Sequence, residues 1–345
     1  MVKIENTEKE SDLLVRGVRD FVDPDDHLRK KILENPSGVV IKFGVDPTRP
    51  DIHLGHAVVF RKLRKFQDLG CKVVFLVGDF TSLIGDPTGN SKVRPEIEQK
   101  EIEANMKTYL DQVGKILLTD KKVFAWIRNS DWYYSSTDLA DDPERKVEMN
   151  IEQDGKTIKA SFPGNSFLAK SIVHNETRMQ KQFSSGKIWD LTVRGLLWTL
   201  RGVTQGRLIN RDMFQDRLKR GEELYMHEML YPVLQGIDSF MIANIFGTCD
   251  LEVGGSDQTF NMLMGRDVMK MNKQNPQAVL SFEILEGLDG KEKMSKSLDN
   301  YVAITDEPEN MYGKIMSLPD SLITKYFKLC TYTPCLLYTS PSPRD

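Results

Sequence analysis

The chain has 345 residues, of which 40% are hydrophobic and 28% are charged, a composition typical of a globular protein that can bury a sizeable core. Its formal net charge of −3 argues against a globally basic nucleic-acid binder, although a local group could form either a solvated helix face or a phosphate contact: Arg61, Lys62, Arg64 and Lys65. The four cysteines form no CxxC pair, which argues against a disulfide framework or a zinc cluster. We find no apolar leader and no membrane-spanning run, so we expect a cytoplasmic protein without membrane contact.

The first half of the chain alternates strands and helices. An apolar, β-branched run begins at Val39, a helical pattern follows the turn PTRPD and ends at Gly70, and a second apolar run, KVVFLVGDF, comes next. A further helix is predicted over roughly residues 96 to 115 and a further strand near residues 122 to 127. This order predicts an α/β fold with a Rossmann-like, doubly wound parallel sheet over residues 39 to 304.

Other segments depart from this rhythm. Residues 1 to 38 are predicted to form an N-terminal helical segment, and residues 131 to 190 an inserted segment with a hairpin that turns at Asp154 and Gly155. The run ELYMHEMLYPVLQGIDSFMIANIF predicts a buried helix. The strand DLEVGG follows, with Ser256 as the predicted N-cap of the next helix.

The C-terminal part of the sequence changes character twice. After Gly287 the chain is polar, DGKEKMSKSLDN, and helical segments are predicted from about Glu307. The string CLLYTSPSPRD, residues 335 to 345, matches one translated reading frame of a transposase-type sequencing-library adaptor. We therefore predict that this string is an artefact and that the natural chain is interrupted near Pro334.

Two histidines, His53 and His56, lie where the first strand ends and a helix is predicted to begin. Their spacing lacks the glutamate and the further ligands of a helical zinc site, so no metal site is predicted. Backbone N–H groups at a helix start favour an anion, Gly55 lets a ligand approach the backbone, and imidazole N–H groups can bind phosphate oxygens. The alternative is a pair of surface histidines at a helix start.

A second candidate site is a loop far along the chain. Its two lysines and two hydroxyls suit a triphosphate, although the loop could equally be only solvated: Lys293, Met294, Ser295, Lys296 and Ser297. The combination of DIHLGH near the first strand with KMSKS near the end of the sheet resembles the two signature motifs of class I aminoacyl-tRNA synthetases.

Polar residues on the predicted buried helix form a third candidate site. Tyr231, Gln235 and Asp238 fall at i, i+4 and i+7, so they share one helix face. A buried carboxylate costs free energy unless a polar group satisfies it. This face is therefore predicted either to line a pocket for a polar ligand or to form an internal hydrogen-bond network.

Two turns complete the set of motifs. In VGGSDQ, Gly255 allows close backbone approach and Asp257 offers a carboxylate to a sugar hydroxyl, unless the segment is simply a capped turn. In LIGDPTGNSKVR, Asp86 ends an apolar run, and Lys92 and Arg94 follow it.

In this order the five motifs resemble those of bacterial tyrosyl-tRNA synthetases of the KMSKS type, over roughly residues 13 to 334. The resemblance implies activation of L-tyrosine by ATP with Mg²⁺ to tyrosyl-adenylate, and transfer to tRNA(Tyr), by a homodimeric cytoplasmic enzyme. It also implies that residues 39 to 304 are the catalytic domain and that residues 305 to 334 begin a helical anticodon-binding domain. The alternatives are a tryptophanyl-tRNA synthetase, a small-molecule nucleotidylyltransferase of the HxGH type and a catalytically silent RNA-binding relative.

The resemblance further implies a role for each candidate residue. Asp86, Tyr231 and Gln235 would bind the tyrosine ammonium group, and Asp238 the phenol hydroxyl. His53 and Thr48 would lie at the γ-phosphate end of ATP, and Lys293 and Lys296 would bind the departing pyrophosphate. The residues expected at ATP are Gly44, Asp46, Thr48, His53, Gly55, His56, Gly255, Asp257, Lys293, Met294, Ser295, Lys296 and Ser297, and Lys92 and Arg94 are candidate contacts to phosphate or tRNA.

One position departs from the family pattern. Better-studied members carry a tyrosine that contacts the substrate phenol just before the Gly-x-Asp-Pro-Thr segment, whereas this chain has Lys42. Recognition of the phenol is therefore expected to depend more on Asp238, and an Asp238→Ala variant should first lose selectivity for tyrosine over phenylalanine. The substrate carboxylate is already ionised and needs no general base, so the protein has to position the reactants and neutralise phosphate charge.

Overall fold

A computed structural model of the chain describes residues 13 to 88, 97 to 133, 146 to 153, 156 to 163, 193 to 295 and 298 to 333. Its main sheet has six strands in the order β1-β8-β7-β2-β3-β4. The strands are β1 (Val18–Val22), β2 (Val40–Val45), β3 (Lys72–Val77), β4 (Phe124–Arg128), β7 (Leu251–Gly255) and β8 (Ala278–Phe282). All neighbouring strands are parallel except the pair β1 and β8. The predicted doubly wound, mainly parallel sheet is confirmed.

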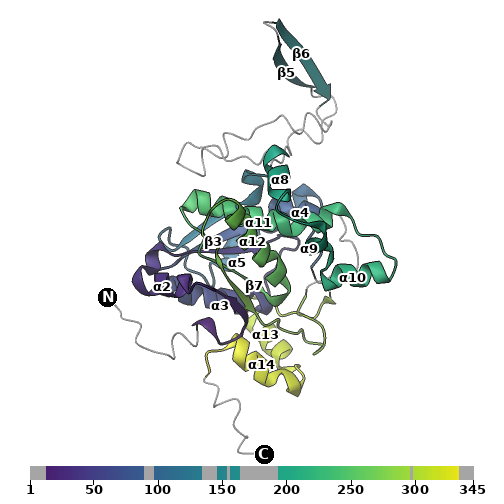
Figure 1. The fold of residues 1–345 in the computed structure, drawn as a ribbon. Coiled ribbons are helices and arrows are strands. Elements are labelled where there is room, and N and C mark those ends of the chain that lie inside the picture. The colour runs from purple at the N-terminus through teal and green to yellow at the C-terminus, as the bar shows by residue number, and fades with distance from the viewer. Residues whose placement is uncertain are drawn as a thin grey trace, which may run out of the picture.

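Helices cover both faces of this sheet (Figure 1). They are α2 (His27–Glu34), α3 (Leu54–Asp68), α4 (Asp79–Ile84), α5 (Gln99–Val113), α8 (Val193–Leu200), α9 (Gln205–Ile209), α10 (Asp212–Lys219), α11 (Met226–Phe246), α12 (Thr259–Met271), α13 (Pro308–Met316) and α14 (Asp320–Cys330). Successive residues of β2 enter different cores: Ile41 packs with α2, α3 and α5, whereas Val40 packs with α11 and α12. A third, smaller core joins α14 to α3 and to Met294.

The strand order reverses between β2 and β7. From β2 the chain continues outward through β3 and β4, whereas β7 continues in the other direction through β8. Ligands of open α/β folds bind where the strand order reverses in this way. The segments that follow β2, β3, β4 and β7 are therefore the first place to look for a site.

Two predictions about local structure are wrong. The N-terminal segment is not wholly helical, because Val18–Val22 forms β1, where Asp20 accepts a hydrogen bond from Ser281 Oγ of β8 (2.7 Å). Ser256 is not the N-cap of an α-helix: it begins a 3₁₀ turn, Ser256–Gln258, and α12 starts only after this turn. A single tighter turn at the start of a helix is common.

The predicted hairpin is confirmed within the inserted segment. Strands β5 (Lys146–Gln153) and β6 (Lys156–Pro163) pair antiparallel, and Figure 1 shows them at the opposite end of the molecule from α13 and α14. The turn residues Asp154 and Gly155, the rest of the insertion from 164 to 190, and the tail from Pro334 onward lie outside the described residues. The proposed domain boundaries stay predictions.

Within the described part of the chain, α11 is long and apolar enough to cross a membrane, but 67% of its most apolar stretch is buried, as in the core helix of a globular domain. The predicted buried helix is therefore confirmed.

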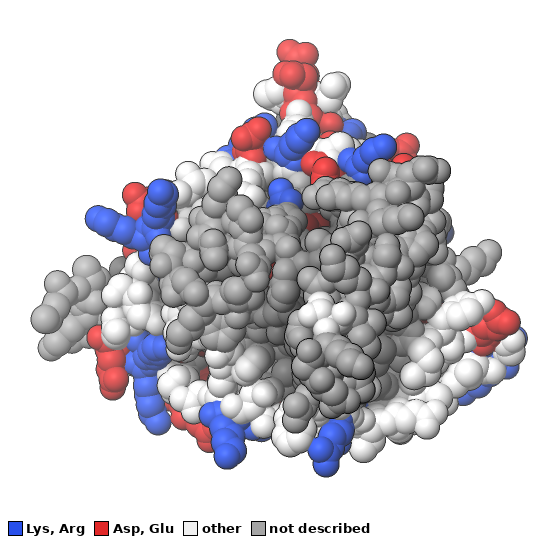
Figure 2. All heavy atoms as spheres, turned by 90° about the horizontal axis from the view of Figure 1, so that it is seen from above, with Lys and Arg blue, Asp and Glu red and all other residues white. Residues whose placement is uncertain are grey.

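On the described surface seen from above, Lys and Arg side chains alternate with Asp and Glu (Figure 2), in keeping with the net charge of −3.

Candidate active site

The two predicted histidines form the first turn of α3. His53 is the N-cap residue; its Nδ1 accepts a hydrogen bond from Gly55 N (3.2 Å), and His56 Nδ1 accepts one from His53 N (3.4 Å). Their ring centroids are 4.0 Å apart. Because each Nδ1 accepts a hydrogen bond, each neutral imidazole carries its proton on Nε2. The turn thus combines two imidazole donors with the positive end of a 15-residue helix.

The loop that precedes α3 is held from the side by α5. Asn105 Nδ2 donates to the Pro47 carbonyl oxygen (2.9 Å), and Gln112 Nε2 donates to the Pro50 carbonyl oxygen (2.7 Å). Thr48 lies between these two anchored prolines. The sequence motif alone does not indicate these two amides, because they belong to a helix about 60 residues further along the chain.

The lysine loop lies against the histidine turn. Met294 is buried with Val58 of α3, and a Cβ atom added at Gly55 would lie 3.9 Å from Met294 Cβ. Lys293 Nζ lies 3.3 Å from Asp257 Oδ2, so the lysine loop also meets the turn after β7. These contacts bring together three motifs that are about 240 residues apart at the extremes.

Two further contacts fix the backbone around Asp257 and the lysine loop. A Cβ atom at Gly255 would lie 2.6 Å from Asp257 Oδ1, so this carboxylate position requires a glycine. Asn300 braces the loop: its Oδ1 accepts from Ser295 N (2.8 Å), and its Nδ2 donates to the Lys293 carbonyl oxygen (3.2 Å).

Asp46, directly after β2, contacts Tyr231, the first of the three predicted polar residues on α11. Tyr231 donates its hydroxyl hydrogen to Asp46 Oδ2 (2.7 Å), and Thr81 Oγ1 donates to Asp46 Oδ1 (2.8 Å). Burial and the nearby carboxylates of Asp46 and Asp86 raise the pKa of Tyr231 well above its usual value. The phenol of Tyr231 therefore stays protonated and acts as a donor.

Asp86 is the second carboxylate at this end of α11. It is buried, and its Oδ2 accepts a hydrogen bond from Gln258 Nε2 (2.7 Å). Its Oδ1 accepts from Thr88 N (2.9 Å), and Thr88 Oγ1 in turn accepts from Arg211 Nη2 (3.2 Å). Two carboxylates beside neutral hydroxyl and amide groups make this end of the site suitable for an ammonium group.

Asp238 lies at the other end of the polar face of α11. It is 3% exposed; Trp132 Nε1 donates to its Oδ1 (3.0 Å) and Asn129 Nδ2 to its Oδ2 (3.4 Å). Burial raises the pKa of Asp238 to about 7, while the positive charge of Lys42 and these two donors limit the rise. The carboxyl group is thus held in place by neutral donors in an enclosed site.

Gln235, between Tyr231 and Asp238, is oriented by two partners. Its Nε2 donates to Glu252 Oε1 (3.0 Å), and its Oε1 accepts from Asn261 Nδ2 (3.2 Å). The face predicted from helical spacing therefore exists, and in the structure its members take part in a hydrogen-bond network. The predicted internal network is thus present, and the ligand pocket on the same face stays a prediction.

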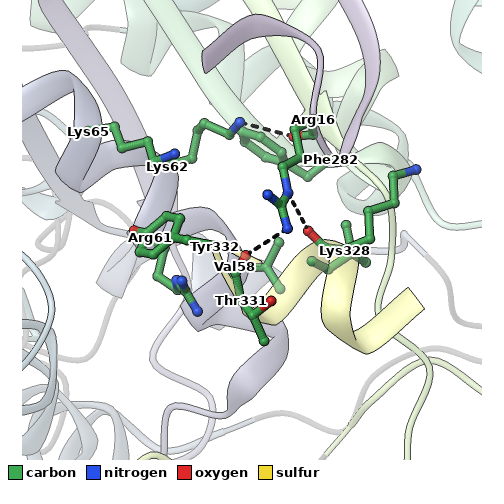
Figure 3. A pocket seen from close by; sticks show the side chains of 11 residues that line it. Arg16, Val58, Arg61, Lys62, Lys65, Phe282, Lys328, Thr331 and Tyr332 are labelled. Carbon is green, nitrogen blue, oxygen red and sulfur yellow. Dashed lines mark hydrogen bonds between the residues drawn. The ribbon is translucent and has the colours of Figure 1, made fainter. Parts of the chain in front are cut away.

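The basic group on α3 makes internal contacts around the hollow in Figure 3. The Arg16 guanidinium donates to four carbonyl oxygens at and after the end of α14 (2.9 to 3.2 Å), and Lys62 Nζ donates to the Arg16 carbonyl oxygen (3.0 Å). Arg61 and Lys65 lie over the Tyr332 ring, 3.9 and 4.4 Å from its centroid. These cations join α3, α14 and the N-terminal segment beside Phe282, the last residue of β8.

The structure places the described candidate residues on neighbouring elements, and several of their partners were not predicted from the sequence. Gly44, Gly55 and Gly255 lie on or just after β2, in the first turn of α3 and at the end of β7. The missed residues are Thr81, Asn129, Trp132, Glu252 and Gln258. Asn129 and Trp132 directly follow β4, so the rule for the carboxyl ends of parallel strands could have indicated them. Four predicted residues lie outside the described part: Lys92, Arg94, Lys296 and Ser297.

Comparisons with known proteins show the family of the chain. The family model described as class I tRNA synthetases (W and Y) matches residues 35–341. The chain is 39% identical to the tyrosine–tRNA ligase of Deinococcus radiodurans, over 93% of this chain and 63% of that protein. It is 37% identical to tyrosine–tRNA ligase 2 of Vibrio cholerae, over 92% of this chain and 65% of that protein. The chain therefore spans slightly less than two thirds of the length of these relatives.

Solved structures share the fold at lower identity. A C-terminally truncated mitochondrial tyrosyl-tRNA synthetase of Aspergillus nidulans is similar with a TM-score of 0.61 and 21% identity, over 97% of this chain and 83% of that one. The tyrosyl-tRNA synthetase of Archaeoglobus fulgidus complexed with L-tyrosine gives 0.58 and 20%, over 94% and 80% of the two chains. From the family match over most of its length, the chain belongs to the class I tRNA synthetases of the tryptophan and tyrosine family.

Proposed function

We propose that this chain is the catalytic part of a tyrosine–tRNA ligase, which activates L-tyrosine with ATP and transfers the tyrosyl group to tRNA(Tyr). The relatives of Deinococcus radiodurans and Vibrio cholerae carry this name. The observation that carries the proposal is the polar face of α11, where paired carboxylates lie at the Tyr231 end and the enclosed Asp238 at the other. Such a face suits an amino acid with an ammonium group at one end and a hydroxyl at the other.

The tyrosine carboxylate attacks the α-phosphate of ATP, the bond between the α- and β-phosphates breaks, and pyrophosphate leaves with its magnesium ion. His53 and His56 donate from Nε2 to phosphate oxygens, with Thr48 beside them, and Lys293 and Lys296 neutralise the leaving pyrophosphate. Asp86, Tyr231 and Gln235 hold the ammonium group, and Asp238 accepts the phenol hydrogen. Gly44, Asp46, Gly55, Gly255, Asp257, Met294, Ser295 and Ser297 surround the nucleotide, and Lys92 and Arg94 contact phosphate or tRNA.

The proposal includes the surroundings of the enzyme. Residues 39 to 304 form the catalytic domain, residues 305 to 334 begin the anticodon-binding domain, and the protein works in the cytoplasm as a homodimer. Exposed apolar side chains on α8 and at the start of α11 support an interface between two copies: Leu197 is 58% exposed, Trp198 62% and Met226 68%. Sedimentation as a monomer at micromolar concentration would contradict the homodimer.

The test is isotope exchange between pyrophosphate and ATP in the presence of tyrosine, tryptophan or phenylalanine. We expect exchange with tyrosine, and its absence would overturn the proposal; exchange with tryptophan alone would assign the chain to the other branch of the family. A Lys293→Ala variant should lower kcat for exchange. The matched control is Lys291→Ala, two residues earlier on the exposed part of the same loop, which should leave kcat unchanged.

A further inference from the structure

A buried ion pair lies directly behind α11 in the middle of the sheet. Lys42 on β2 is fully buried and stands opposite Glu252 on β7, with 2.8 Å between Lys42 Nζ and Glu252 Oε1. Two charges removed from water are stabilised only when their remaining hydrogens and lone pairs also find partners. The partners of this pair therefore indicate what it is for.

All three hydrogens of the Lys42 ammonium have acceptors. Besides Glu252 Oε1, Nζ donates to the Gln235 carbonyl oxygen and to Ser239 Oγ, each at 2.8 Å. No hydrogen is left for a substrate phenol, so Lys42 does not take over the direct contact made by tyrosine in better-studied family members. Its contacts go instead to Gln235 and Ser239, three residues before and one residue after Asp238 on α11.

Glu252 is equally well satisfied. Its Oε1 also accepts from Gln235 Nε2 (3.0 Å), and its Oε2 accepts from Ser239 Oγ (3.2 Å) and from Gln277 Nε2. A Cβ atom at Gly265 of α12 would lie 2.5 Å from Gln277 Nε2 and 2.9 Å from Ser239 Oγ. The network is thus closely packed against the backbone of α12 at a glycine.

We propose that Lys42 and Glu252 are positioning residues for the amino-acid pocket: they fix the Gln235 amide and the turn of α11 that carries Asp238. The inference rests on the proposed function and specifies how its substrate site is held. A well-packed apolar pair would stabilise the fold as well as this ion pair does. What an apolar pair would not supply are the directional bonds to Gln235 and Ser239.

The main test removes both charges at once. In Lys42→Met/Glu252→Leu neither charge of the pair is left in the core without the other, and Asp238 keeps its donors Trp132 and Asn129, so we expect a melting temperature close to that of the wild type. Loss of the bonds that orient Gln235 should raise the KM for tyrosine about tenfold in pyrophosphate exchange, with the KM for ATP and kcat within about twofold of the wild type. If the pair had a purely structural role, the melting temperature would change, and the KM for tyrosine would not rise selectively over the KM for ATP.

A conservative variant and a matched control sharpen the test. Lys42→Met/Glu252→Gln keeps an amide oxygen that can accept from Gln235 Nε2, so it should restore most of the affinity for tyrosine. The control is Lys31→Met/Asp250→Asn, which removes a second ion pair (2.6 Å) directly before β7 that makes no hydrogen bond to the described residues of α11, and it should leave the KM for tyrosine unchanged. Ser239→Ala, which removes one partner without touching a charge, should raise the KM for tyrosine severalfold even if the double variants fail to fold.

Each outcome bears on a different statement. A wild-type KM for tyrosine in Lys42→Met/Glu252→Leu, or in Ser239→Ala where the double variant is unfolded, overturns the positioning role. Absence of tyrosine-dependent exchange in the wild type overturns the proposed function instead. Calorimetric titration of the same proteins with tyrosine alone gives the affinity independently of catalysis, and it should weaken in parallel with the rise in KM.

Discussion

The carboxyl groups at the two ends of the polar face on α11 have different surroundings. At the Tyr231 end, Asp46 and Asp86 stand beside hydroxyl and amide groups. At the other end, Asp238 accepts hydrogen bonds from the neutral side chains of Trp132 and Asn129, and burial raises its pKa to about 7 although the charge of Lys42 opposes the rise. The first arrangement favours a cation, whereas the second favours a neutral hydrogen-bonding group. This difference in charge gives an amphiphilic amino acid one direction in which to bind.

A chain of hydrogen bonds connects the two ends. Asn129 Nδ2 donates both to Asp238 Oδ2 (3.4 Å) and to Thr81 Oγ1 (2.9 Å), and Thr81 donates to Asp46 Oδ1 (2.8 Å). Tyr231 donates to the other oxygen of Asp46 (2.7 Å). One chain of hydrogen bonds through the residues after β2, β3 and β4 thus connects both ends. Substitutions at different points of this hydrogen-bond chain should affect binding at the two ends unequally.

The largest effect on stability and activity is expected at Gly78, where the hydrogen-bond chain is most closely packed. A Cβ atom at Gly78 would lie 2.1 Å from Asp46 Oδ1 and 2.4 Å from Thr81 Oγ1. Gly78→Ala should therefore displace Asp46, lower the free energy of unfolding by about 3 kcal/mol and abolish tyrosine-dependent exchange. Urea denaturation and exchange kinetics measure both. In Gly206→Ala, where no atom lies within 4 Å of the added Cβ, neither quantity should fall.

A change at the ammonium end alone comes next. Asp86→Asn keeps the shape of the side chain but removes one of the two carboxylates, and it should raise the KM for tyrosine about 100-fold because a charge-assisted contact to the ammonium group is lost. The inhibition constant of 3-(4-hydroxyphenyl)propionate, which lacks the ammonium group, should not rise. An equal loss of affinity for both compounds would show that Asp86 acts through the shape of the site. Asp68→Asn, on the exposed end of α3, is the control.

At the phenol end, the raised pKa of Asp238 predicts that the free energy of unfolding depends on pH. The pKa of Asp238 is raised from 3.8 to about 7 in the folded protein, so between these values the folded state binds more protons than the unfolded state. The stabilising effect of this proton is present at low pH and is lost as the pH rises through 7. From pH 5 to pH 8 the wild type should lose about 2 kcal/mol relative to Asp238→Asn. Parallel stability curves for the two proteins would refute the raised pKa.

The sequence could predict those parts of the site whose residues are close together in the chain. The shared face of Tyr231, Gln235 and Asp238 follows from helical periodicity, and strands β2, β3, β4 and β7 follow from their apolar runs. By contrast, Asp238 is 106 residues from Trp132 and 109 residues from Asn129, and no periodicity connects them. β1 and β8 were missed for a similar reason, since β1 is stabilised as a strand by pairing with a segment about 260 residues away.

The smallest effect is expected from a single donor at the phenol end. Trp132→Phe removes the Nε1–H that donates to Asp238 Oδ1 (3.0 Å) and keeps an aromatic ring in the core. With one donor fewer, the pKa of Asp238 should rise further and its carboxyl group should be held less firmly, so we expect the preference for tyrosine over phenylalanine to fall about tenfold. The ratio of kcat/KM for the two amino acids in pyrophosphate exchange measures this preference. Because Asn129 still donates to Asp238 and links it to Thr81, the KM for ATP should stay unchanged. A parallel change in the KM for ATP would show that loss of a donor to Asp238 also alters the Tyr231 end of the polar face.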